Sequence, residues 1–255
     1  MDISFKKKVG DLQKEVALKS ADLEEYVEDF EVEIEKCSLS DKFINISPRC
    51  VRCNLCAQEC PVDAIEMADT IKPAKILNNC VKCEICAQTC PVRCINVLKT
   101  TAEVDDQIDY RLESINVPHR VIRMKNIEVS PEKCTSCGTC VKLCPTQAIT
   151  VENDHIPAEI NKKLCVGCGS CASVCPQQAI TLERDMGPVI VTKELLIDQD
   201  TCVECLICEE NCPTMAIKLE DGEVVLDKDK CILCDVCSTK CPVNALKLER
   251  MAHES

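Results

Sequence analysis

One cysteine pattern repeats six times along the chain, in the form Cys-x-x-Cys-x-x-Cys-x-x-x-Cys-Pro. It takes up 24 of the 26 cysteines in a chain of 255 residues. Three thiolates at two-residue intervals can wrap the backbone around three corners of a cubane cluster, and the fourth, just before Pro, points away and serves a neighbouring cluster. The pattern therefore predicts six 4Fe–4S clusters, with all 24 cysteines as iron ligands.

The six copies, numbered motifs 1 to 6 in chain order, fall into three pairs. Their first cysteines lie 30, 31 and 29 residues apart within a pair, whereas the gaps between pairs are 54 and 37 residues. The copies are Cys50, Cys53, Cys56, Cys60 (motif 1); Cys80, Cys83, Cys86, Cys90 (motif 2); Cys134, Cys137, Cys140, Cys144 (motif 3); Cys165, Cys168, Cys171, Cys175 (motif 4); Cys202, Cys205, Cys208, Cys212 (motif 5); and Cys231, Cys234, Cys237, Cys241 (motif 6). The spacing predicts three two-cluster modules in tandem.

Within each module we expect crossed ligation, because the fourth cysteine of one motif ligates the cluster of the other. The expected ligand sets are Cys50, Cys53, Cys56 with Cys90; Cys80, Cys83, Cys86 with Cys60; Cys134, Cys137, Cys140 with Cys175; Cys165, Cys168, Cys171 with Cys144; Cys202, Cys205, Cys208 with Cys241; and Cys231, Cys234, Cys237 with Cys212. A nested arrangement, with one module inserted in another, stays open, although the near-constant offset fits it less well.

Two other uses of cysteine, structural zinc and disulfides, fit the motifs less well than clusters do. Structural zinc uses two Cys-x-x-Cys pairs per metal, which leaves the third cysteine of each motif without a role. Disulfides belong to oxidising compartments, and the charged N-terminus has no apolar stretch of signal-peptide type. The two cysteines outside the motifs are interpreted as a free thiol (Cys37) and as a small buried residue beside a cluster (Cys94), which stands where the other five copies have Ala.

The segments between the motifs predict small mixed modules of the α+β class. A short helix or turn follows each Cys-Pro and leads into a strand, and Asp221-Gly222 predicts a hairpin turn before residues 223–226. We expect three ferredoxin-like modules and an N-terminal helical extension. The expected segments are an amphipathic extension that needs a surface to pack on (1–42), module 1 (43–97), a linker (98–125), module 2 (126–197) and module 3 (198–255).

Net charge and hydropathy argue against two kinds of partner, nucleic acid and the membrane interior. The formal net charge of −13 argues against nucleic acid, which requires clustered Lys and Arg. No apolar run approaches the roughly 18 residues of a membrane span. We therefore expect a cytoplasmic protein, held at a membrane only through a partner complex. The three histidines are scattered and are expected at the surface rather than as ligands.

At the motif cysteines the chain resembles bacterial-type two-cluster ferredoxins repeated in tandem, and the array is similar to the polyferredoxins of methanogenic archaea. This resemblance implies a non-catalytic electron-transfer subunit of a hydrogenase, heterodisulfide reductase or formylmethanofuran dehydrogenase complex. Its partners would be redox subunits, with a soluble ferredoxin or hydrogenase as donor or acceptor. The Cys-Gly-x-Cys form frequent in that family occurs only at Gly138 and Gly169, so cluster potentials should differ.

Two rival functions are a freely diffusing electron carrier or store, and an enzyme whose clusters feed its own catalytic centre. The sequence contains no phosphate-binding loop, dinucleotide fingerprint or nucleophile–base arrangement that would support the second. Electrons are expected to enter at one end of the array and leave at the other.

Metal content tests the cluster assignment. Protein purified anaerobically should contain about 24 iron and 24 acid-labile sulfide ions, four of each per cubane. Near-stoichiometric zinc with little iron, measured by elemental analysis, would refute it.

Overall fold

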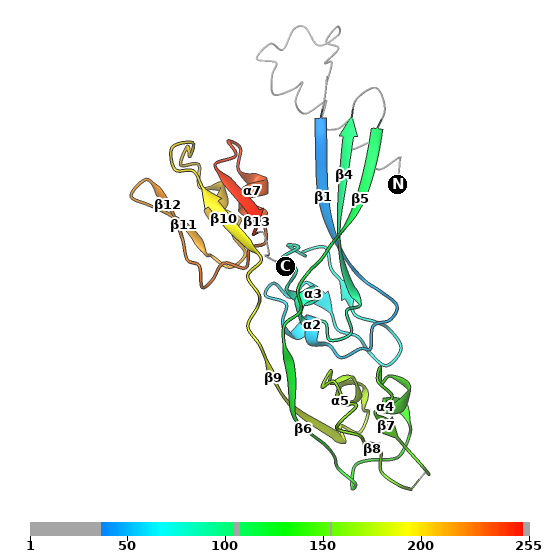
Figure 1. Ribbon diagram of the computed structural model, residues 1–255. Helices are drawn as coiled ribbons and strands as arrows, with labels where there is room; N and C mark the ends of the chain where they lie inside the picture. The colour runs from blue at the N-terminus through cyan, green and yellow to red at the C-terminus, as the bar shows by residue number, and fades with distance from the viewer. Residues whose placement is uncertain (1–36, 105–107, 154, 252–255) are drawn as a thin grey trace. The chain divides into compact units, whose positions relative to one another are not determined.

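The computed structural model describes residues 37–104, 108–153 and 155–251 (Figure 1). It divides into two compact units, residues 1–40 with 101–111, and residues 41–100 with 112–255. The second unit holds all six motifs. Its helices have only four or five residues and most of its strands are short, as expected for a mixed fold built around tight ligand loops. Among the described residues, no helix is long and apolar enough to cross a bilayer.

The middle pair of motifs lies between two antiparallel strands, β6 and β9, which Figure 1 shows side by side. Val129 pairs with Ile180 and Ile122 with Met186, with a bulge between Met124 and Asn126. The elements in order are β6 (Ile122–Val129), α4 (Thr139–Lys142), β7 (Ile149–Thr150), β8 (Glu159–Ile160), α5 (Ser170–Val174) and β9 (Ile180–Met186). Strands β7 and β8 form a second, smaller antiparallel pair.

The last pair of motifs repeats this plan. Strand β10 pairs with β13, so that Leu195 faces Leu248, and β11 pairs with β12. The predicted turn at Asp221-Gly222 is confirmed: both residues have positive φ, as a tight hairpin requires. The elements are β10 (Lys193–Ile197), α6 (Ile207–Glu210), β11 (Ile217–Glu220), β12 (Glu223–Leu226), α7 (Val236–Lys240) and β13 (Leu246–Arg250).

The first pair of motifs lies between β1 and β4, to which β5 adds as a third strand in the order β1-β4-β5. The elements are β1 (Cys37–Ile46), α2 (Leu55–Gln58), β2 (Ile65–Glu66), β3 (Lys75–Ile76), α3 (Ile85–Thr89), β4 (Ile95–Val104) and β5 (Ile108–Ile115). Residues 98–125, expected as a linker, are thus largely strand. The reason is visible in the alternation of apolar and charged residues from Tyr110 to Glu113, which suits a strand.

Strand pairing also moves the start of each module upstream of its expected boundary. Strand β1 begins at residue 37 rather than 43, β6 at 122 rather than 126, and β10 at 193 rather than 198. Each opening strand pairs with a strand more than 40 residues later, so local sequence gives no sign of which module it joins. Modules 1, 2 and 3 below mean β1–β4, β6–β9 and β10–β13. The expected N-terminal helix falls in residues 1–36, outside the described residues.

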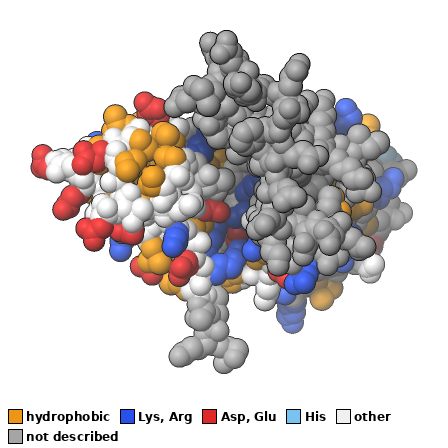
Figure 2. Space-filling model, turned by 90° about the horizontal axis from the view of Figure 1, so that it is seen from above, with side chains coloured by type: hydrophobic (Ala, Val, Ile, Leu, Met, Phe, Trp, Pro, Cys, Tyr) orange, Lys and Arg blue, Asp and Glu red, His pale blue; other side chains and the backbone are white. Residues whose placement is uncertain are grey.

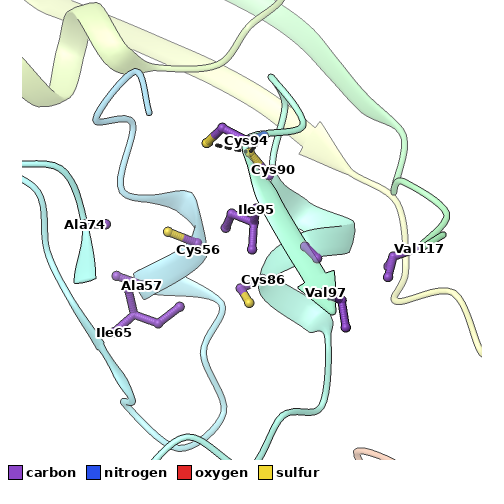
Figure 3. Close-up of a cluster of buried hydrophobic side chains, with 11 residues drawn as sticks. Cys56, Ala57, Ile65, Ala74, Cys86, Cys90, Cys94, Ile95, Val97 and Val117 are labelled. Carbon is purple, nitrogen blue, oxygen red and sulfur yellow. Dashed lines mark hydrogen bonds between the residues drawn. The ribbon is translucent and has the colours of Figure 1, made fainter. Parts of the chain in front are cut away.

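Each module has its own small core, in which motif cysteines take the place of aromatic residues. In module 1, Cys56, Cys86 and Cys90 pack with Ile65 and Val97 (Figure 3). The other two cores combine motif cysteines with Ile, Leu, Val and Ala in the same way. Because the chain contains no Trp and only three Phe, the apolar surface around the cysteines is modest.

Candidate metal-cluster sites

Cysteines from two paired motifs line common cavities. Four cavities each contain three cysteines from one motif and the fourth cysteine of its partner. The sets are Cys50, Cys53, Cys56 and Cys90; Cys134, Cys137, Cys140 and Cys175; Cys144, Cys165, Cys168 and Cys171; and Cys202, Cys205, Cys208 and Cys241. These groupings match four of the six sets expected for crossed ligation, with the motifs paired 1–2, 3–4 and 5–6.

For the remaining two ligand sets, electrostatic effects between the cysteines indicate which of them lie near one another. Burial raises the pKa of Cys83, and the nearby charge of Cys60 raises it further. The same holds in module 3, where burial raises the pKa of Cys234 and Cys212 adds to the effect. The fourth cysteine of motifs 1 and 5 therefore lies near the first three cysteines of motifs 2 and 6.

The donor chemistry suits a cluster rather than a single ion. Within the described ranges, no three His, Cys, Asp or Glu side chains gather closely enough to hold one metal ion. A cubane cluster needs its four thiolates farther apart than a single metal ion does, because each thiolate binds a different iron at a different corner. Burial raises the pKa of Cys56 to about 11 and of Cys171 to about 12. Such thiols are neutral at pH 7, so binding iron must displace their protons.

The loops between the cysteines adopt left-handed backbone conformations at fixed places. In every motif, φ is positive at the residues just before and just after the second cysteine, and again at the third residue after the fourth cysteine. In motif 1 these are Arg52, Asn54 and Asp63, with φ of 60°, 61° and 49°. Alternation of right- and left-handed residues turns successive N–H groups into a concave nest, which binds anions and occurs at many iron–sulfur sites.

This conformation is costly for most residues here. Only three of the eighteen positions are glycine: Gly138, Gly167 and Gly169. A left-handed residue with a Cβ costs roughly 1–2 kcal/mol. Leu206 (φ 61°) and Glu84 (φ 78°) are held there without the side-chain advantages of Asn or Asp. Strain of this kind persists only where the surroundings over-determine it.

A backbone N–H group points at the sulfur of the fourth cysteine in all six motifs. The donor is always the residue four positions later: Ala64, Cys94, Ala148, Ala179, Ala216 and Ala245, at N–S distances of 3.2 to 3.3 Å. All six donor residues are buried. The recurring small residue thus brings the backbone close to a ligand sulfur, where an N–H group stabilises the thiolate form.

Cys94 is the exception among these donors. Its side chain is 3% exposed and lines the same cavity as Cys50, Cys53, Cys56 and Cys90, and its sulfur is 3.4 Å from that of Cys90 (Figure 3). A hydrogen bond from Cys94 lowers the pKa of Cys50 to about 5 and that of Cys90 to about 6. The side chain of Cys37 is outside the described part of the structure.

One polar cluster at a motif loop was not expected from the sequence. Glu84 follows the second cysteine of motif 2, is completely buried, and its Oε1 accepts contacts from Lys42 (3.0 Å), Lys193 (3.3 Å) and Arg250 (2.6 Å). Burial opposes ionisation of the carboxyl, but the charges of Lys193 and Lys42 outweigh it and hold the pKa of Glu84 below its ordinary value. The only signal in the sequence is a Glu where motifs 3 and 4 have Gly.

Comparison with known proteins agrees with these sites. A 4Fe–4S dicluster domain model matches residues 79–148 and 164–216, a second dicluster model matches 133–180, and a 4Fe–4S binding domain model matches 47–66 and 224–247. The first model spans motifs 2–3 and 4–5, whereas the cavities pair motifs 1–2, 3–4 and 5–6. Sequence similarity alone therefore leaves the pairing of motifs open.

Three curated relatives are similar over parts of their length. An uncharacterized polyferredoxin-like protein of Methanocaldococcus jannaschii (MJ0514) is 54% identical over 103 residues, which are 40% of this chain and 41% of that protein. Polyferredoxin protein MvhB of Methanothermus fervidus is 34% identical over 105 residues, 41% of this chain and 21% of MvhB. A second M. jannaschii polyferredoxin-like protein (MJ0514.1) is 39% identical over 41 residues, covering 16% of this chain and 25% of that protein. The matches thus cover less than half of each relative.

The strained loops and small cores predict that folding depends on the clusters. Without iron, nothing compensates the left-handed residues, and modules of this size with few aromatics bury too little apolar surface to fold alone. Chelation of iron should abolish far-UV circular dichroism of the strands and amide protection in all three modules. Rebuilding the clusters from iron and sulfide should restore both signals, and a native-like apo-protein would contradict the prediction.

Proposed function

Because the chain is a tandem 4Fe–4S ferredoxin that resembles the polyferredoxins of methanogens, we propose that it holds six cubane clusters and passes electrons between redox partner proteins. The observation that carries the proposal is the grouping of cysteines in shared cavities, three from one motif and one from its partner. A bound cluster supplies one-electron redox chemistry. The chain itself provides four thiolate ligands and a fixed set of N–H donors to each cluster.

The protein environment would set the redox potential of each cluster. Hydrogen bonds to ligand sulfurs and burial are the main controls of cluster potential. The fourth-cysteine sulfurs all accept an N–H group, whereas the exposure of the second cysteine varies: Cys168 is buried and Cys205 is exposed. The six clusters are therefore expected to have unequal potentials, as an electron carrier with several steps requires.

We further propose that the protein works in a larger anaerobic oxidoreductase complex of the hydrogenase, heterodisulfide reductase or formylmethanofuran dehydrogenase type. The resemblance to methanogen polyferredoxins supports this class of partner. An electron carrier rather than a catalytic enzyme is consistent with the matched families. The alternative, a free electron carrier or store, is distinguished by anaerobic purification of the native protein, which should bring down stable redox subunits if the complex exists.

Iron counts in paired variants test the crossed ligand sets. Cys60→Ala and Cys80→Ala should each remove one cluster, about four iron. If both cysteines bind the same cluster, the double variant should also lose about four iron, whereas Cys60→Ala with Cys50→Ala should lose about eight. If an alanine variant loses both clusters of the module, the corresponding serine variants allow the same comparison, with the clusters detected by EPR spectroscopy. Additive iron loss in the Cys60 and Cys80 pair would refute crossed ligation.

Charge predicts that module 3 has the lowest potentials. Module 3 (residues 193–250) carries seven Lys or Arg against thirteen Asp or Glu, whereas module 1 (residues 37–104) carries eight against seven. Figure 2 shows the acidic side chains around a hydrophobic group on its left side, where Figure 1 draws β10–β13. A unit charge about 10 Å away in water is worth about 0.4 kcal/mol, or roughly 20 mV for one electron. Salt screening reduces this effect.

An EPR-monitored redox titration of the full chain checks this ordering. Glu204→Gln, next to Cys205, should raise the midpoint of the most negative component by up to about 20 mV. The matched variant Glu66→Gln in module 1 should leave that component unchanged and shift a less negative one. A shift of the most negative component by Glu66→Gln alone would refute the charge argument.

A further inference from the structure

Two polar junctions join the cluster loops of different modules. The first brings module 3 onto motif 2 of module 1. The Nζ of Lys193, on β10, donates to the carbonyl oxygen of Leu233 (2.9 Å) in motif 6 and to that of Cys83 (3.4 Å) in motif 2. The same Nζ pairs with Glu84, and Lys193 is only 5% exposed. One buried cation therefore binds the loops of motifs 2 and 6 together.

The second junction brings module 2 onto motif 1 of module 1. The hydroxyl of Ser170, in the loop of motif 4, donates to the carbonyl oxygen of Val51 in motif 1. The side-chain amide of Asn54 donates to the hydroxyl of Ser173 (3.0 Å). Both hydrogen bonds link a motif 1 loop to helix α5, so the cysteines of motifs 1 and 4 are brought close. Within the described ranges, no hydrogen bond or ion pair joins the motif loops of modules 2 and 3.

The connecting segments hold module 1 between the other two. The chain that leaves towards module 2 and the chain that returns towards module 3 both attach to helix α3. Arg120 N donates to Gln88 O (2.9 Å), and the side chain of Gln88 exchanges two hydrogen bonds with the backbone of Ile190 (2.8 and 2.9 Å). Arg120 also pairs with Glu59 (2.6 Å) and donates to Gly187 O (2.8 Å). Both junctions are thus anchored on the module that comes first in the sequence.

The exposure of the cysteines distinguishes two motifs from the other four. Among the described cysteines, Cys137 and Cys205 are exposed, and the rest are partly or fully buried. Cys137 belongs to motif 3 and Cys205 to motif 5, the two motifs of modules 2 and 3 that take no part in a junction. Val203 and Leu206, which line the same cavity as Cys205, are also exposed. A redox partner would therefore reach the ligand loops most readily at motifs 3 and 5.

We infer that electrons pass the clusters in the spatial order motif 3, 4, 1, 2, 6, 5, or its reverse, and that the N-terminal module is the middle of the array. This inference rests on the proposed function. Each hop oxidises one cluster and reduces the next, with a one-electron redox protein as donor at one end and another as acceptor at the other. The acidic surroundings of Cys205 commit the partner at that end to a basic docking surface.

The route can be tested in the full, cluster-loaded chain by injecting electrons at motif 3. His155 is exposed, and the carbonyl of the next residue, Ile156, accepts a hydrogen bond from Ser136 in the motif 3 loop (2.6 Å). A ruthenium–bipyridyl label on His155, in a His119→Gln, His253→Gln background, delivers an electron there when excited by light with a sacrificial amine donor. Cytochrome c, a basic one-electron acceptor, reports the electron's arrival at the acidic end through its haem absorbance.

Two serine variants separate the possible routes. Cys168→Ser alters the cluster of motif 4, which is needed both by the inferred route and by a route in sequence order from motif 4 to motif 5. Cys83→Ser alters the cluster of motif 2, which only the inferred route needs. An oxygen ligand that lowers a midpoint by about 60 mV reduces the population of the reduced cluster about tenfold. Iron content is measured in both variants, because loss of the cluster interrupts the route equally.

We expect Cys83→Ser to slow the reduction of cytochrome c about tenfold or more, to the residual rate seen in Cys168→Ser. That residual rate measures direct escape of electrons from motif 3. If Cys168→Ser slows the transfer and Cys83→Ser does not, the inferred order is wrong while electron conduction stands. If neither variant changes the rate although all clusters are present, electrons do not pass through the array, and the proposed function fails together with the route.

Discussion

The need to bring four cysteine sulfurs to the corners of one small cube governs the local structure of this protein. A regular helix or strand cannot place three cysteines, each separated from the next by two residues, around a common centre, so the backbone alternates between right- and left-handed conformations within each motif. Each helix starts directly after the left-handed residue that follows the second cysteine and ends before the fourth cysteine, which explains why α2 to α7 are limited to four or five residues. The same alternation turns N–H groups inwards, where negative charge is expected.

The small cores follow from the same requirement. Cysteine side chains occupy the positions at which a module of this size would otherwise place large apolar residues, and the residue that donates to each fourth cysteine must be small and buried. Five Ala and Cys94 meet that condition. In module 1, Cys94 introduces an additional sulfur beside Cys90. Modules 2 and 3 have Ala at both of the corresponding positions, so module 1 differs from them chemically.

Buried charge joins modules that the chain order would keep apart. Glu84 is completely buried with three cationic partners, and removing Glu84 would leave the buried Lys193 ammonium without a carboxylate partner, at a cost of about 3–5 kcal/mol. A network of this kind specifies one way of docking module 3 on module 1. It also leaves an excess of positive charge between motifs 2 and 6, in a chain whose net charge is −13. Positive charge at this position favours an added electron on either neighbouring cluster.

The amino-acid sequence by itself determined the type of cofactor, the six cysteine motifs, the family and the hairpin at Asp221-Gly222, because all of these follow from residue types at short, fixed spacing. Tertiary structure decided what depends on residues far apart in the chain. It assigned β1, β6 and β10 to their modules, because each pairs with a strand more than 40 residues away. It also placed Lys193 against Glu84 and Ser170 against Val51, more than 100 residues apart. Local spacing carries no information about such contacts, since they arise only when folded modules pack, and they set the order of the clusters in space.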